Sequence, residues 1–149
     1  MKLATVFSVA VLATIGLGAT AVLAQENPIV ARQELMKANG KETKVGAAMA
    51  KGEKPFDLAA AKKIFGTYEQ SAQKLPDLFP PDSKTGHKTT VAPKIWEDMA
   101  NFKARIKKLG EDSKKAQASV TDLASFKTAF GAVTKDCGGC HREYRVKKN

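Results

Sequence analysis

Cysteine and histidine are scarce in this chain, whose 149 residues contain two of each. A structural zinc site needs four ligands, and beyond Cys137, Cys140 and His141 the only other histidine is His87, so a zinc site is not favoured. A thioredoxin-like redox pair would need its cysteines at a strand-to-helix junction, and we expect no strand. His87 is expected to be a solvated loop residue.

The sequence also lacks any convincing run of alternating β-branched residues, any internal repeat and any low-complexity tract. Apolar residues instead recur at steps of three and four in four stretches. These stretches are separated by clusters of proline, glycine, serine and threonine. Because this spacing places the apolar residues on one side of a helix, the pattern predicts an all-α fold.

Long apolar runs are missing except at the N-terminus. There, a basic start at Lys2 is followed by an apolar stretch and by small residues before Gln25. This order is typical of a secretory signal peptide, so we expect residues 1–24 to be the signal and residues 25–149 to form one mature periplasmic domain. A retained membrane anchor is the alternative, because the run is nearly long enough to span a bilayer.

Negative charge is under-represented. Lysine and arginine outnumber aspartate and glutamate by 25 to 15, which gives a net charge of +10, or +9 once the signal with Lys2 is removed. A surface this basic favours encounters with acidic partners or anionic membranes. It does not indicate nucleic acid as a partner, because the chain has no arginine-rich segment with interleaved aromatic residues and no recognisable nucleic-acid-binding motif.

Capping and helix-breaking residues divide the mature chain into four predicted helices joined by one long loop. The helices are expected at residues 27–49, 57–75, 93–109 and 121–144, with the loop at 76–92. Gly110 should end or weaken the third helix, and Thr121 should cap the fourth. Four such helices favour an antiparallel four-helix bundle packed at a shallow crossing angle.

The two cysteines belong to the segment Cys137-Gly138-Gly139-Cys140-His141, which has the C-x-x-C-H pattern of covalent haem attachment. Each sulfur adds to one vinyl group of the porphyrin while the histidine reaches the iron. On a helix, this spacing directs Cys137, Cys140 and His141 to one face. The motif therefore predicts one haem c, held by two thioether bonds, with His141 as the proximal iron ligand.

The first helix has a face with room for this haem. At roughly 100° per residue, Ile29, Arg32, Met36, Gly40 and Ala47 share one narrow face. Glycine within a helix costs about 1 kcal/mol relative to alanine, and a flat macrocycle would supply a packing reason for Gly40. Arg32 could reach a haem propionate. Spacing alone suits Met36 equally to be an iron ligand or a core side chain that fills a gap.

Together these features resemble the cytochrome c-prime family, also called class II c-type cytochromes. The resemblance covers essentially the whole mature chain. Residues 137–145 carry its specific part, and residues 31–36, 51–57 and 93–96 add weaker matches. It implies a four-helix bundle with covalently attached haem c.

In that family the position four residues after the arginine of an Arg-Gln pair faces the iron, and here it is Met36. The resemblance thus implies low-spin His141/Met36 ligation of the cytochrome c-556 type and one-electron transfer in the periplasm. Members with an apolar, non-ligating residue there are high-spin and bind NO or CO, which is the alternative function. The resemblance also implies that Arg32 and Gln33 bond the propionates and that Arg145 lies beside the proximal histidine.

The partners expected for such a carrier are redox proteins with an acidic docking face. We expect no enzymatic activity, and a peroxidase is the least favoured function because the first helix has no distal histidine. Many members of the family are dimers that pack through their first two helices. The lysines on the outer faces of those helices leave monomer and homodimer both open.

Overall fold

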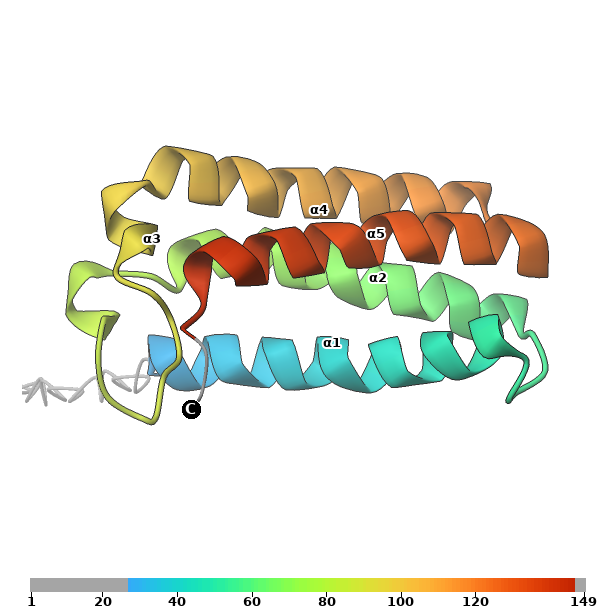
Figure 1. Cartoon of the computed structure of the whole chain (residues 1–149), viewed down its shortest axis with the longest axis horizontal. Coiled ribbons are helices and arrows are strands. Elements are labelled where there is room, and N and C mark those ends of the chain that lie inside the picture. Colours follow the sequence, from blue (N-terminus) through green and yellow to red (C-terminus); the bar gives the residue numbers. More distant parts are fainter. Residues whose placement is uncertain (1–26, 147–149) are drawn as a thin grey trace, which may run out of the picture.

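The computed structural model describes residues 27–146 (Figure 1). The predicted signal peptide and the alternative membrane anchor both lie outside the described residues. Within residues 27–146, no helix is both long and apolar enough to cross a membrane.

Four long helices run side by side along the long axis of the molecule, each antiparallel to the one before it in the chain (Figure 1). They are α1 (Pro28–Lys51), α2 (Leu58–Lys74), α4 (Met99–Ser119) and α5 (Leu123–Tyr144). The connection between α2 and α4 contains the short helix α3 (Lys94–Glu97) and two single 3-10 turns, η1 (Leu75–Asp77) and η2 (Pro81–Ser83). The predicted all-α, four-helix bundle is confirmed.

The first two helices begin where their capping residues predicted. The side chain of Asn27 accepts hydrogen bonds from the backbone N–H groups of Ile29 and Val30, and Pro28 occupies the first turn. The carboxylate of Asp57 accepts from the N–H of Ala60 at 2.8 Å. Such caps satisfy backbone N–H donors that are free at the start of a helix. These two helix starts could therefore be predicted from the local sequence.

Two expectations about helix ends were wrong. The cap of α5 is Asp122 rather than Thr121, because Asp122 and Ser125 bond each other's backbone N–H groups in a capping box. Gly110 does not end a helix, since α4 continues through it to Ser119. A Cβ at Gly110 would lie 3.1 Å from the Cβ of Ala72, so the glycine lets α4 approach α2 closely.

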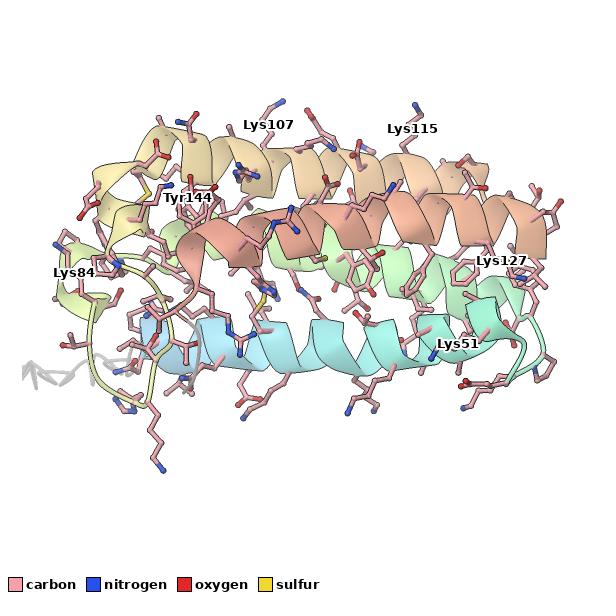
Figure 2. The ribbon with its side chains drawn as sticks, viewed as in Figure 1. Lys51, Lys84, Lys107, Lys115, Lys127 and Tyr144 are labelled. Carbon is pink, nitrogen blue, oxygen red and sulfur yellow. The ribbon has the colours of Figure 1, made fainter. Side chains whose placement is uncertain are left out.

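The predicted third helix is also interrupted, at Asp98. The helix α3 ends at Glu97, and Asp98 has a non-helical backbone with φ −129° before α4 begins at Met99. The Oη of Tyr144 donates to Oδ2 of Asp98 at 2.8 Å, so the break lies where α5 meets this segment. Tyr144 stands between α5 and α4 in Figure 2.

The interior divides into two apolar clusters along the bundle. The first contains Phe65, Tyr68, Phe126 and Phe130 and fills the half where α1 turns into α2. The residues of the second come from the other half of the bundle, and those that are buried are Ala72, Leu75, Phe79, Ile95, Phe102, Ile106 and Tyr144. Most members of the second cluster line a cavity in this half of the bundle.

Candidate haem-binding site

A cavity of about 840 Å³ opens between α1, α4, α5 and the connection that follows α2. This volume lies within the roughly 300–1,000 Å³ typical of ligand pockets. Its apolar lining residues are Met36, Leu75, Phe79, Val91, Ile95, Phe102, Ile106 and Leu109. A largely apolar enclosure of this size suits a large, flat and hydrophobic group.

The motif residues Cys137, Cys140 and His141 line this cavity from α5. Both cysteines are half-buried and are not joined in a disulfide. Burial raises the pKa of each thiol, so the cysteines are neutral at pH 7 in the bundle. Burial, and then the positive charge of Arg145, lower the pKa of His141 even though its side chain is exposed in the open cavity. A neutral imidazole is the form that binds iron.

Met36 and Gly40 line the same cavity from α1. A Cβ added to Gly40 would meet no atom within 4 Å, so no neighbouring protein atom accounts for the glycine and its bare backbone faces open space. Met49 is buried in the first cluster and Met99 packs beside the second. Among the methionines of residues 27–146, Met36 alone reaches the cavity.

The other two residues expected on the face of Met36 lie elsewhere. Ile29 is buried, with its Cδ1 3.7 Å from the Cβ position of Gly86 in the loop. Ala47 packs against the first cluster. The cavity therefore covers only the middle part of the face that the helical projection outlined.

Arg32 lines the cavity but uses most of its donors on the loop after α2. Its Nη1 donates to the carbonyl of Leu78 and to Oγ of Ser83, both at 2.9 Å. Its Nη2 donates to the carbonyl of Ser83 at 2.7 Å and to Oγ1 of Thr89 at 3.1 Å. The guanidinium stands over the ring of Phe79 and is 3% exposed, and burial lowers its pKa. Only Nε is left, buried and without a partner among the described residues, for the predicted bond to a propionate.

Gln33 and Arg145 complete the predicted site residues. Gln33 lines the cavity, and its Nε2 donates to the carbonyl of His87 at 2.9 Å. Arg145 lines the cavity from the end of α5, where it forms an antiparallel bridge with Val91. His87 lies in the exposed loop, as expected, and its Nε2 is 3.2 Å from Nδ2 of Asn27.

Sequence reasoning missed several lining residues. Phe79 lies in the loop, outside any helical stripe, yet its ring packs edge-on against Phe102 with centroids 4.7 Å apart. Asp136 and Tyr144 line the cavity from α5 on either side of the motif. Tyr144 continues the apolar stripe of its helix, so that spacing could have identified it, whereas no local pattern indicated Phe79.

The described residues fit a covalently attached haem. Two unpaired thiols and an imidazole on one helix would hold the porphyrin edge and the iron. A thioether and an uncrowded glycine stand on a second helix lining the same cavity. A buried guanidinium with no carboxylate partner suits a propionate at the rim.

Comparison with known proteins identifies a family. A family profile described as Cytochrome C' matches residues 27–145. Cytochrome c' of Rhodopseudomonas palustris is 40% identical over 149 residues, which cover 100% of this chain and 99% of the relative. Cytochrome c-556 of Agrobacterium fabrum is 44% identical over 118 residues, which cover 78% of this chain and 80% of the relative.

The same family is found by structure. The solved cytochrome c' of Rhodopseudomonas palustris superimposes with a TM-score of 0.81 and 42% identity, covering 84% of this chain and 100% of that one. These matches confirm the resemblance drawn from residues 137–145 and the weaker matches before them. This chain belongs to the cytochrome c' family, whose members bind haem c within a four-helix bundle.

Proposed function

We propose that this cytochrome is a periplasmic one-electron carrier with a single low-spin haem c, attached through Cys137 and Cys140 and ligated by His141 and Met36. The observation that carries the proposal is that Met36 and His141 line one cavity from two different helices. When bound, the haem supplies the Fe(III)/Fe(II) couple. With His141 and Met36 both holding the iron, the thioether ligand would raise its potential and no coordination position would remain for a substrate.

The surroundings of the two ligands support electron transfer. Phe79, Phe102 and Tyr144 form a continuous edge-to-face series beside the cavity, with ring centroids 4.7 and 5.1 Å apart. Closely packed aromatic rings give a rigid, weakly polar wall that rearranges little when charge changes. Such a wall keeps the reorganisation energy low and, with burial and nearby charge, tunes the potential.

The lining also weighs against catalysis. Within the described part of the chain, His141 is the one histidine that lines the cavity. A peroxidase would need a second base on the opposite side to take a proton from peroxide. Asn39 and Thr43 line the cavity from α1, but each engages α2: Asn39 accepts from Ser71 at 2.8 Å, and Thr43 bonds Tyr68 at 2.8 Å.

Export is the remaining part of the proposal. The basic start, apolar stretch and small residues before Gln25 support a signal peptide. Fractionation of the native host tests this directly. The protein should be released with the periplasmic contents, and its N-terminus should be Gln25. Recovery in the membrane fraction with residues 1–24 retained would support the anchor instead.

The spectrum of the purified holoprotein tests the ligation. Protein from a host competent in cytochrome assembly should show a low-spin spectrum with a sulfur-to-iron charge-transfer band in the far red. Met36→Ala should remove that band and open the iron to CO and NO. Met99→Ala is the matched control, because Met99 packs beside the second cluster outside the cavity and its loss should leave the band unchanged.

Two results would contradict the proposal. A high-spin spectrum in the intact protein, with CO bound at once on reduction, would assign the alternative gas-binding function. A colourless product with the mass of the bare polypeptide would exclude covalent haem altogether.

A further inference from the structure

Positive charge is concentrated around the mouth of the cavity. Five exposed cationic side chains line it, and they come from four separate segments: Lys37 and Lys44 from α1, Lys88 from the loop, Arg105 from α4 and Arg145 from the end of α5. Asp136 is the one carboxylate in the lining. This ratio is far more basic than the 25 to 15 of the whole chain.

Most of these charges have no counter-charge. Lys44, Lys88, Arg105 and Arg145 have no carboxylate oxygen within 4.0 Å among the described residues, whereas Lys37 pairs with Glu34. Asp136 is itself engaged by Lys108 at 2.9 Å. Four of the five cations at the mouth of the cavity are therefore not paired with a carboxylate.

Lysines elsewhere on the surface are of two kinds. Among the described residues, Lys62, Lys103 and Lys115 have no carboxylate oxygen within 4.0 Å, whereas others are paired. Lys94 pairs with Glu143, Lys107 pairs with Glu111, and Lys108 pairs with Asp112. Exposed pairs like these cancel much of the local field at a distance. The mouth of the cavity differs from the rest of the surface in that four unpaired cations from four separate segments surround one opening, where the haem edge would face solvent.

We infer that this cationic rim, formed by Lys44, Lys88, Arg105 and Arg145, is the docking face for an acidic surface of a redox partner protein. The inference rests on the proposed function, because it places the contact at the point where an electron would leave. Complementary charge steers such encounters and raises the association rate. A lipid headgroup offers the same negative charge but accepts no electron, so a protein is the occupant that this location favours.

The apolar content of the face suits a short-lived complex. Among the described residues, the exposed large hydrophobic side chains are Leu58 and Val146. Val146 follows Arg145 at the rim and is 45% exposed, and Leu58 begins α2. A charged face with one small apolar contact beside it fits the weak, rapidly exchanging class of redox complexes.

Charge reversal at two positions tests the location of the face. The rim variant Lys44→Glu/Lys88→Glu changes two residues that are not haem ligands. The control Lys115→Glu/Lys127→Glu changes the net charge by the same amount on α4 and α5, where both side chains stand outside the cavity lining (Figure 2). The probe is a carboxylate-terminated monolayer on gold, which presents an acidic face while both adsorption and the interfacial electron-transfer rate are measured.

At low ionic strength the rim variant should adsorb about tenfold more weakly and transfer electrons about tenfold more slowly than the wild type. The control should change by less than about twofold, and added salt should remove the difference. Equal loss in both variants would overturn the inference, because net charge rather than the rim would then be responsible. Binding of wild type to phosphatidylglycerol vesicles, lost in the rim variant, with no such preference on the monolayer, would also overturn it in favour of a membrane.

These outcomes are separate from failure of the proposed function. A wild-type holoprotein that adsorbs but shows no reversible Fe(III)/Fe(II) wave would contradict electron transfer itself. The optical spectra of both double variants should match the wild type, which shows that the haem environment is unchanged.

Discussion

Arg32 and Ser83 lie 51 residues apart in the chain, yet the guanidinium of Arg32 donates to both the hydroxyl and the carbonyl of Ser83. The two groups are buried, and the hydroxyl of Ser83 in turn donates to the carbonyl of Pro80 at 2.8 Å. This contact fastens the connection after α2 to the first helix. The loop that brings Phe79 and Val91 into the cavity lining is therefore held against α1 by this side chain.

Loss of this contact should destabilise the protein. In Arg32→Met, the carbonyls of Leu78 and Ser83 lose charged donors inside the protein, so the free energy of unfolding should fall by about 2–4 kcal/mol. Denaturant unfolding measures the loss, and hydrogen exchange at the Thr89 amide, which donates to Gly86, reports the loop directly. Lys41→Met, on the exposed face of α1, is the control and should change stability by less than about 0.5 kcal/mol.

A stability loss no larger than that of the control would show that the loop is held by other contacts. A normal stability accompanied by a shifted reduction potential would instead indicate that Arg32 acts mainly on a propionate.

Two glycines of α1 should respond to alanine in different ways. A Cβ at Gly46 would lie 2.4 Å from Cε2 of Phe130, so Gly46→Ala should lower the free energy of unfolding by about 1–3 kcal/mol. Its effect should be confined to packing between α1 and α5. Thermal unfolding measures the loss, and the visible spectrum should stay that of the wild type.

Gly40→Ala should change the visible spectrum and leave the stability of the bundle largely unchanged. Alanine favours the helix by about 1 kcal/mol and meets no protein atom, so any disturbance would come from crowding of the haem. We expect a shifted spectrum or a weakened Met36 bond with little loss of helical circular dichroism. An unchanged spectrum would show that Gly40 does not lie against the macrocycle.

The bond from Tyr144 to Asp98 should make stability depend on pH. The hydrogen bond from Tyr144, and then that from Asn101, hold the pKa of Asp98 below its ordinary value of 3.8. A group with a depressed folded pKa stabilises the protein above its unfolded pKa and loses that effect as the pH falls through the folded value. The stability advantage of wild type over Tyr144→Phe should therefore be full above the ordinary pKa of aspartate and shrink at more acid pH.

Tyr68→Phe is the matched control for this measurement. The hydroxyl of Tyr68 forms a hydrogen bond with the hydroxyl of Thr43. Mainly because Tyr68 is buried, its pKa is raised to about 12. Loss of the Tyr68 hydroxyl should lower the free energy of unfolding by the same amount at every acid pH. Parallel pH profiles for the two variants would rule out a role for the Asp98 carboxylate.

The protein should be a monomer in solution at micromolar concentration. A stable dimer buries on the order of 1,000 Å² or more with an apolar centre. Over residues 27–146 the exposed large hydrophobic residues are Leu58 and Val146, while α1 carries the exposed cations Lys37, Lys41 and Lys44. Light scattering coupled to size exclusion measures the mass, and a species of twice the monomer mass would contradict this prediction.

The features that the sequence predicted correctly are those encoded within a few residues. Asn27 and Asp57 cap helices through bonds to residues two or three positions away, so nearby sequence was enough to predict their role. The spacing of Cys137, Cys140 and His141 is likewise local, and its placement on one helix needed no knowledge of the rest of the fold.

The wrong predictions concern positions where residues far away in the sequence determine the local structure. The helix α4 continues through Gly110, where the close approach of Ala72 favours a residue without a Cβ. The break at Asp98 coincides with a bond to Tyr144, 46 residues away. Neither neighbour is visible in local sequence. Arg32 shows the same limit within the site, since its face on α1 was predicted but its partners in the loop were not.

The half-buried thiols of Cys137 and Cys140, whose pKa values are raised by their surroundings, bear on the order of events during assembly. Thioether formation consumes reactive sulfur, and sulfur shielded from water in its protonated form reacts slowly. A polypeptide that completes its bundle before haem attachment would therefore form the proposed thioether bonds slowly. If haem c is attached to these two sulfurs as proposed, attachment should be faster while the helices are still apart than after the bundle has closed.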